Sequence, residues 1–326
     1  PNLLQNLLGE QTLSASFIPV YSRLLRQGRE EEAGRFAGAI FGLLLATTGG
    51  LVLLGVLLAE PLVALLTPGF RADEARVAAG LAEVDRFPLA VAAVRIIFPM
   101  TGVLVLAAWS LGVLNSHRRF FLPYFAPVLW NAAIIAGLLL VGNRVGGGSL
   151  RSATLTAPAA LDRLLLAACW GALVGGVLQF GVQLPLVARL IRGFRFSLST
   201  RVKGVRESLR AFGPLLAGRG VVQLSSYLDL VLASLLMAGA LAGLGWAQTL
   251  YLLPVSLFGM SVAAAELPEL SRRTAPEERS GLEERLAAAL RQMAYLTVPT
   301  AVGYLVFGLL LVEGIYRRGS FGLEDS

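Results

Sequence analysis

The chain has 326 residues, of which 56% are hydrophobic and 15% charged, and its formal net charge is +7. The apolar residues exceed what a soluble core needs and stand in long blocks, so the composition predicts a polytopic membrane protein. With one cysteine, Cys169, and one histidine, His117, the chain offers no disulfide framework and no thiolate metal cluster. A zinc site or a Ser-His-Asp triad would have to use His117, which has no suitable partner nearby. We therefore expect that the protein is not an enzyme and binds no cofactor.

Eight stretches of the chain are predicted to span a bilayer, which takes about 20 apolar residues in a helix. Because each block is continuously apolar rather than alternating, the sequence favours helices over a barrel and an all-α fold. In chain order the stretches are 1–22, 37–58, 96–114, 123–142, 164–188, 211–237, 241–265 and 292–312. The first is the most polar, since it contains Gln5 and Glu10.

The basic residues are concentrated in alternate loops, namely 23–36, 115–122, 189–210 and 267–291. This distribution is typical of the positive-inside bias, so we expect these four loops to be cytoplasmic. Loop 189–210 is the most basic; it can contact anionic membrane lipids, although its orientation in the membrane alone would also explain its charge. A nucleic-acid surface would need basic and aromatic residues together on one soluble domain, so no nucleic-acid partner is expected.

A weak internal repeat predicts two parallel lobes of six spans each. Pro19, Ser22 and Arg23 match Pro268, Ser271 and Arg272 at one constant offset. Repeats separated by an even number of spans share their orientation in the membrane.

The repeat divides the chain into a first lobe over 1–190, a basic linker over 191–210 and the start of a second lobe over 211–326. Both lobes would then be incomplete, and the chain would be a fragment of a longer protein.

The stretch 211–237 is apolar but carries polar residues on one side of the predicted helix. At about 100° per residue, four of them fall within an arc of roughly 120°: Arg219, Gln223, Ser226 and Asp229. Charges at the bilayer centre cost about 2.5 to 3.5 kcal/mol, so they usually line a cavity or find a partner. We expect this stretch to line a transport pathway; the alternative is that its charges form structural pairs between the lobes.

The residue types indicate what such a pathway would bind. Arg219 suits a phosphate, which a guanidinium can hold with two hydrogen bonds, and Asp229 suits a sodium ion or a proton. Arg95 is a further candidate, although it can also extend to the outer surface. Gln223 and Gln248 are candidate ligands or, alternatively, hydrogen-bonding residues between helices.

Several blocks resemble one known family. The blocks LNS at 114–116, FAPVLWN at 125–131, GGVLQ at 175–179 and LPVSLFGMSVAAAELPELS from Leu253 are similar to those of the MurJ (MviN) lipid II flippases. That family belongs to a wider superfamily of exporters of drugs and lipid-linked sugars. The resemblance covers nearly the whole chain and matches spans two to nine of a protein with usually fourteen.

The resemblance implies a function in bacterial cell-wall synthesis. Such a protein moves lipid II, the undecaprenyl-pyrophosphate-linked peptidoglycan precursor, to the outer leaflet of the bacterial cytoplasmic (inner) membrane by alternating access of its two lobes. It implies substrate contacts at Arg219, Gln223, Ser226, Gln248, Arg95, Gln5 and Glu10, with cation or proton coupling at Asp229. Lipid II, membrane lipids and possible cell-wall synthesis proteins are the implied partners.

The chain departs from the family pattern at two positions where arginines are usual. Gln5 stands in the first stretch, and Thr249 follows Gln248 in the seventh. The alternatives are therefore a transporter of another polyprenyl-linked sugar or a small cation, and a membrane scaffold that transports nothing.

Overall fold

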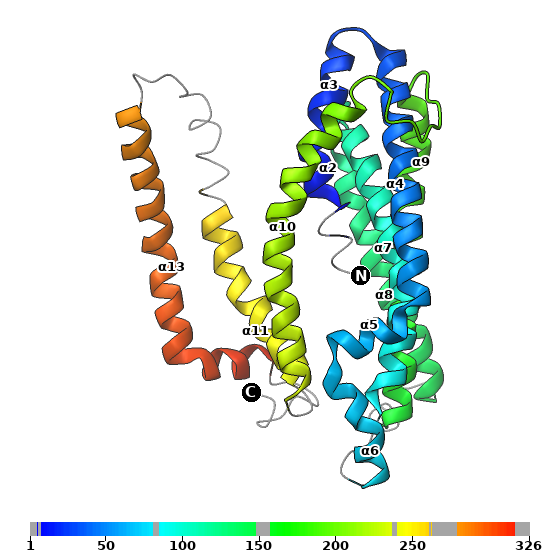
Figure 1. Ribbon diagram of the computed structural model, residues 1–326. Helices are drawn as coiled ribbons and strands as arrows, with labels where there is room; N and C mark the ends of the chain where they lie inside the picture. Colours follow the sequence, from blue (N-terminus) through cyan, green and yellow to red (C-terminus); the bar gives the residue numbers. More distant parts are fainter. Residues whose placement is uncertain are drawn as a thin grey trace. The chain divides into compact units, whose positions relative to one another are not determined.

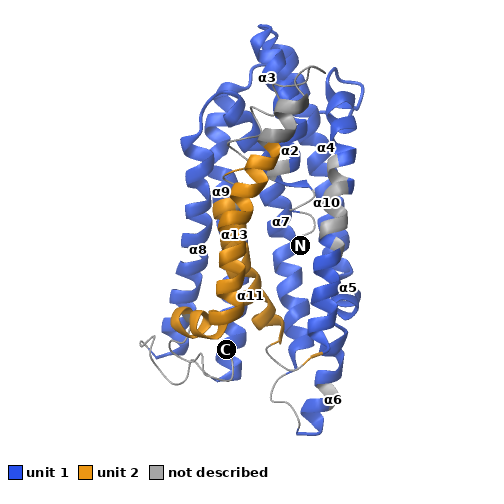
Figure 2. Ribbon diagram, turned by 90° about the vertical axis from the view of Figure 1, so that its left-hand side faces the viewer, with its two compact units in different colours: residues 1–235 blue, residues 236–326 orange. Residues whose placement is uncertain are grey.

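The computed structural model describes residues 5, 8–80, 85–147, 157–236, 240–260, 262 and 279–316. In this part of the chain the regular structure is helical and no strand occurs, which confirms the predicted all-α class. The chain divides into two compact units, residues 1–235 and 236–326 (Figure 2). The predicted lobe boundary at the 191–210 linker stays a prediction.

The helices of the first unit follow in chain order (Figure 1). They are α2 (Glu10–Ser16), α3 (Ile18–Arg26), α4 (Glu30–Leu57), α5 (Ala59–Leu66), the 3-10 helix η1 (Pro68–Ala72), α6 (Asp73–Ala78), α7 (Arg86–Ser116), α8 (Phe121–Val145), α9 (Pro158–Leu190) and α10 (Val205–Ser234). The second unit contains α11 (Ala240–Pro254), the π-helix η3 (Val255–Met260) and α13 (Arg279–Tyr316).

Six helices of the described chain are long and apolar enough to cross a membrane. They are α4, α7, α8, α9, the segment Ala240–Phe258 and the segment Leu286–Ile315. Each contains or overlaps one of the predicted apolar stretches. The stretch 211–237 forms α10, which is not among the six, and the described part of stretch 1–22 forms the two short helices α2 and α3. The structure thus supports a multi-pass helical membrane protein but leaves the predicted number of eight spans unconfirmed.

The core of the first unit, where α2 and α3 pack against α4 and α7, contains a cluster of aromatic residues among aliphatic ones. The ring of Phe17 stacks on Tyr21 and Phe36, with centroids 5.1 and 5.3 Å apart. The indole Nε1 of Trp109 donates a hydrogen bond of 3.2 Å to the carbonyl oxygen of Ala37. The stacked rings fill the core, and the indole N–H keeps a hydrogen-bond partner, so both stabilise this packing.

Residues 191–204 connect α9 to α10, and part of this linker packs directly on α4. A Cβ atom at Gly34, Gly38 or Gly42 would overlap the carbonyl oxygen of Arg192, Arg195 or Ser197, respectively. These three glycines are spaced four residues apart and so share one face of α4. The linker can therefore approach the helix backbone closely only because this face has no side chains.

The segment after α4 closes the opposite end of the unit. Helices α5, η1 and α6 contact α7, and the backbone at Gly69 in η1 lies against Ser234, the last residue of α10. The short helix α6 follows η1 directly, and residues 81–84 lie outside the described chain.

In the second unit the α-helical hydrogen bonding of α11 ends at Pro254, because proline cannot donate a backbone hydrogen bond, and a π-helix follows. The hydroxyl of Tyr304 in α13 donates a 2.9 Å hydrogen bond to the carbonyl oxygen of Leu250.

Candidate functional site on helix α10

Helix α10 is anchored at both of its ends within the first unit. It begins after Gly204, whose φ of 90° is left-handed and favours glycine. Arg23 of α3 donates hydrogen bonds of 2.9 and 2.5 Å to the two carboxylate oxygens of Glu207. At the other end, η1 packs against Ser234. The 30-residue helix, about 45 Å long, is thereby held along its length.

One face of α10 packs into the first unit. The buried residues Val205, Ser208 and Ala233 recur with helical spacing, while Phe212 and Leu230 are half-buried on the same face. By contrast, Leu228 and Leu232 on the other face are 65% and 62% exposed. The helix thus has an inward face and an exposed apolar face.

The predicted polar arc coincides with the inward face and its edge. Gln223 lies on that face and is half-buried, whereas Ser226 and Asp229 are exposed. The helical period places position 219 on the inward face as well. The side chain of Arg219 lies outside the described residues, so its role stays a prediction.

The first unit contains three further predicted site residues outside α10, namely Gln5, Glu10 and Arg95. Helix α2, which begins at Glu10, packs against both α10 and α7 (Figure 1). Arg95 is an exposed residue of α7, and Gln5 is an exposed residue that precedes α2. Within the first unit α2 therefore contacts both α10 and α7, which carries Arg95, although the side chain of Glu10 is not described.

Gln248 belongs to the second unit. It is half-buried on α11, next to Thr249, whose hydroxyl donates a 3.0 Å hydrogen bond to the carbonyl oxygen of Gly245 within the same helix. A threonine bonded to its own helix backbone does not replace the positive charge of an arginine.

Three of the four basic loops meet at one end of the first unit, which we call the basic end. It comprises residues 23–36, 115–120 and 191–204. Ion pairs join Arg23 to Glu207 and Arg192 to Glu30, and the ring of His117 contacts the hydroxyl of Tyr21 at 3.1 Å. This arrangement agrees with the predicted placement of these loops on one side of the membrane.

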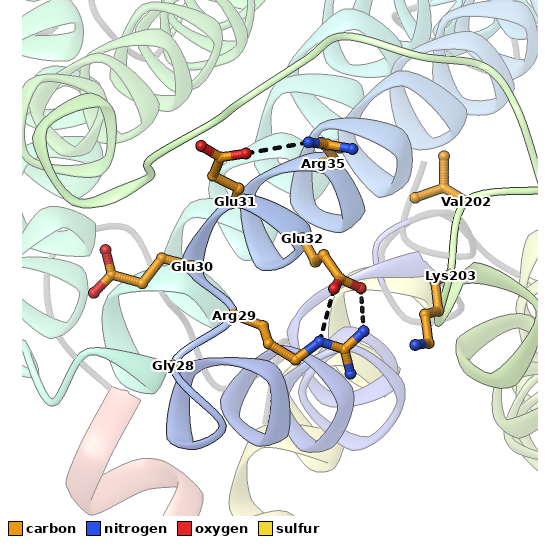
Figure 3. Close-up of a pocket in the computed structure, with 8 residues that line it drawn as sticks. All are labelled: Gly28, Arg29, Glu30, Glu31, Glu32, Arg35, Val202 and Lys203. Carbon is orange, nitrogen blue, oxygen red and sulfur yellow. Dashed lines mark hydrogen bonds and ion pairs between the residues drawn. The ribbon is translucent and has the colours of Figure 1, made fainter.

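A cavity of about 620 Å³ opens at the basic end (Figure 3). Its charged lining consists of three carboxylates and three cations: Glu30, Glu31, Glu32, Arg29, Arg35 and Lys203. Arg29 pairs with Glu32 and Arg35 pairs with Glu31. Because the charges balance, this cavity provides no net positive field for an anionic ligand, and α10 remains the better candidate.

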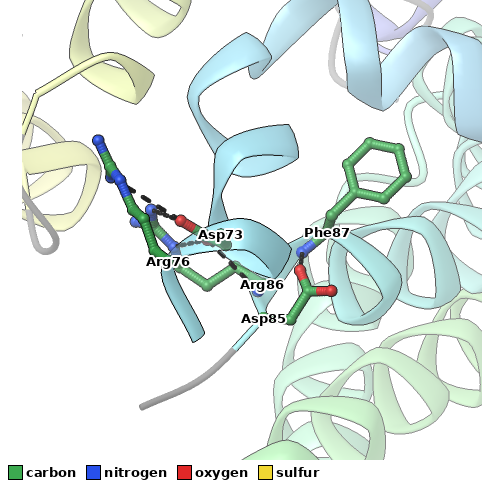
Figure 4. Close-up of polar contacts among 5 residues, drawn as sticks. All are labelled: Asp73, Arg76, Asp85, Arg86 and Phe87. Atoms are coloured by element: carbon green, nitrogen blue, oxygen red, sulfur yellow. Dashed lines mark hydrogen bonds and ion pairs between the residues drawn. The ribbon is translucent and has the colours of Figure 1, made fainter. Parts of the chain in front are cut away.

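The opposite end contains an ion pair that sequence reasoning missed (Figure 4). The Asp73 side chain is only 2% exposed and accepts hydrogen bonds of 2.6 and 2.9 Å from Nε and Nη2 of Arg86. These hydrogen bonds, helped by the charges of Arg86 and Arg76, hold the pKa of Asp73 below its usual value. Nothing in the spacing of the two residues marked them as partners, since charged residues are expected in any external loop.

His117 lies in a polar contact rather than in a reactive cluster. Its partial burial lowers the pKa of the imidazole, and the charge of Arg119 acts in the same direction. Among the described residues, no group of three or more histidine, cysteine, aspartate or glutamate side chains could hold a metal ion.

Comparisons with known proteins identify relatives of one kind. The family model described as "Lipid II flippase MurJ" matches residues 1–326. The chain is 28% identical to the "Probable lipid II flippase MurJ" of Aquifex aeolicus, covering 100% of this chain and 57% of that protein. It is 30% identical to the "Lipid II flippase MurJ" of Burkholderia cenocepacia, over 98% of this chain and 58% of that protein. The chain therefore spans somewhat more than half the length of these relatives.

A solved structure has the same fold. It is described as "Lipid II flippase MurJ, inward closed conformation" and superposes with a TM-score of 0.71 at 23% identity, covering 100% of this chain and 60% of that one.

Proposed function

This chain belongs to the lipid II flippase MurJ family, and from that premise we propose that it is part of a transporter that moves lipid II across the bacterial inner membrane. Transport runs from the inner to the outer leaflet, and the polyprenyl tail stays in the lipid. A flippase moves its substrate without changing it, so the protein is a transporter and not an enzyme. Cell-wall synthesis proteins that produce or use lipid II are the proposed partners.

The observation that carries this proposal is the orientation of α10. Gln223 of the polar arc is half-buried on the face that packs into the first unit, Ser226 and Asp229 are exposed, and Leu228 and Leu232 lie on the exposed apolar side. A pyrophosphate with attached sugars and peptide cannot cross hydrocarbon without polar partners. A helix with a polar side that packs against α2 supports such a passage.

In the proposed pathway the pyrophosphate binds Arg219, because a guanidinium donates two parallel hydrogen bonds to phosphate. Gln223 and Ser226 donate further hydrogen bonds to the headgroup, whereas the role of Gln248, in the second unit, stays a prediction. Arg95, Gln5 and Glu10 extend the polar wall along α7 and the N-terminal segment.

Asp229 is proposed to couple transport to a sodium ion or a proton. It lies ten residues after Arg219, or about 15 Å along the helix axis, so the two charges do not neutralise each other directly. Its exposure leaves it open to an ion from solution. Alternating access of two lobes joined by the 191–210 linker would then carry the headgroup across.

A second candidate is a transporter of another polyprenyl-linked sugar or of a small cation. The observation that favours it is the absence of positive charge at Gln5 and Thr249, since fewer cations reduce the preference for pyrophosphate. On that proposal Asp229 matters more than Arg219. If neither residue matters, the chain is a scaffold.

The test uses bacterial cells depleted of their own lipid II flippase that express this protein from its natural reading frame. The readout is the amount of lipid II that becomes accessible outside. We expect Arg219→Ala to reduce it about tenfold or more, because hydrogen bonds to charged groups are worth about 1.5 to 3 kcal/mol.

Arg210→Ala is the matched control, since Arg210 is an exposed residue of the same helix outside the polar arc. Normal accessibility with Arg219→Ala in a correctly inserted protein would overturn the pyrophosphate assignment. A loss with Asp229→Asn alone would favour the second candidate.

A further inference from the structure

Helices α8 and α9 enclose a groove of about 750 Å³ on the surface of the first unit. Its floor is a close crossing of the two helices. A Cβ atom at Gly171 would lie 2.9 Å from the carbonyl oxygen of Ala133, and one at Gly137 would lie 3.0 Å from that of Ala167. Small residues at this crossing let the backbones approach and leave a channel beside them.

The walls of the groove are apolar and exposed. Leu140, Trp170 and Leu178 line it and are 65%, 56% and 49% exposed. In a membrane protein such a surface meets lipid chains rather than water. The groove is therefore shaped for a hydrocarbon chain.

The length and position of the groove match one leaflet. From Ala133 to Arg144 it follows α8 for about 17 Å, and half of the hydrocarbon core of a bilayer measures about 15 Å. Helix α8 starts beside the basic end, so Arg144 near its C-terminus lies at the opposite end of the unit. Along α8 the groove thus runs from mid-membrane to the headgroup level of the leaflet away from the basic loops; along α9 it extends for about 22 Å, from Arg163 to Leu178, past the midplane.

Two arginines, Arg144 and Arg163, line the groove, each near the end of its helix at that headgroup level. Both are exposed, and neither forms an ion pair with a described residue. Asp162 is adjacent in sequence to Arg163 but pairs with neither arginine in the described chain. Two guanidinium groups that have no ion-pair partner in the described part of the chain, above an apolar groove, are complementary to a phosphate attached to a hydrocarbon chain.

We propose that this groove binds an anionic phospholipid of the outer leaflet. One acyl chain lies along Leu140 and Trp170, and Arg144 and Arg163 hold the phosphate. The site is separate from α10, so it stands whether or not the protein transports lipid II. An uncharged or zwitterionic lipid with the same chains binds less tightly, because its headgroup offers no net negative charge.

Native mass spectrometry of the purified protein tests this assignment by measuring how much added phosphatidylglycerol or phosphatidylcholine of identical acyl chains is retained. We expect preferential retention of phosphatidylglycerol. The double variant Arg144→Gln/Arg163→Gln should weaken it about tenfold or more, since each basic residue near a lipid surface contributes appreciably. The variant Arg119→Gln/Arg189→Gln removes the same charge from the other ends of α8 and α9 and should retain the lipid.

Ala136→Phe narrows the groove without changing its charge, because Ala136 is an exposed residue of the groove lining. It should also reduce retention. Equal retention of both lipids, or unchanged retention in the Arg144→Gln/Arg163→Gln protein, would overturn the proposal. Displacement of phosphatidylglycerol by a polyprenyl phosphate at a lower concentration than by phosphatidylglycerol itself would assign the groove to the polyprenyl lipid instead.

Discussion

The two ends of the first unit differ in how far their ion pairs are exposed to water. At the basic end the pairs are open to solvent: Arg192 and Glu30 lie 3.0 Å apart with 78% and 51% of their side chains exposed. At the opposite end Asp73 is almost fully buried against Arg86 and Arg76, and the guanidinium of Arg86 also lies 4.3 Å from the ring centroid of Phe70.

This difference shows that the number of ion pairs does not measure how firmly a segment is held. An exposed pair contributes about 0.2 to 1 kcal/mol because water screens it, whereas a buried carboxylate depends on its partner. At the basic end the close packing of the linker on Gly34, Gly38 and Gly42 holds the structure instead. The two ends therefore respond to different substitutions.

The largest effect is expected at the buried pair. Asp73→Ala leaves the partly buried Arg86 without its carboxylate and should lower the free energy of unfolding by about 2 to 3 kcal/mol, less than for a fully buried pair because Arg86 keeps some contact with water. The measurement is thermal unfolding of the detergent-solubilised protein. The double variant Asp73→Ala/Arg86→Leu should recover part of the loss, because replacing both partners removes the unpaired charge. A double variant no more stable than Asp73→Ala would show that the ion pair is not the cause.

Lowering the pH tests the same difference between the two ends. The pKa of Asp73 is lowered in the folded protein, so its pair contributes stability above the ordinary aspartate pKa of about 3.9. That contribution is lost as the pH falls from there through the lowered value. Asp73→Ala should therefore remove part of the acid sensitivity, measured as the difference between unfolding curves near pH 6 and pH 3.

A smaller effect is expected for the glycine face of α4. Gly38→Ala places a methyl group against the carbonyl oxygen of Arg195 and should cost about 1 to 2 kcal/mol, because the linker must move away. Gly49→Ala is the matched control in the same helix, since no atom lies within 4 Å of its added Cβ. Thermal unfolding and proteolysis of the 191–204 linker provide the readouts. Equal behaviour of the two variants would contradict the packing role of the linker.

The membrane helices could be predicted because the requirement for a long apolar block is local to each segment. The linker packing could not, because the glycines of α4 and their contact partners lie far apart in sequence. The sequence also predicted that the sixth span starts at residue 211, whereas α10 begins at Val205. An apolar window ends where charged residues begin, but the helix continues through them.

The sequence could predict the candidate site only within a single helix. Helical periodicity is sufficient to place Arg219, Gln223 and Ser226 on one face. It does not reveal that α10 packs against α2, because that contact depends on tertiary structure. The roles of Arg95 and Gln248 also depend on tertiary placement, so they stay predictions.

The smallest effect is expected for the most exposed pair of the basic end. Arg192→Gln removes the 3.0 Å ion pair with Glu30 and should change the free energy of unfolding by less than about 0.5 kcal/mol, because both side chains are already solvated. The carbonyl oxygen of Arg192 still lies against Gly34 in this variant, so the backbone packing of the linker is kept. Unfolding measured at low and at high salt separates the two contributions, since salt screens the pair but not the packing. If Arg192→Gln were as destabilising as Gly38→Ala at both salt concentrations, the ion pair would be holding the linker in place, and the contrast between the two ends would fail.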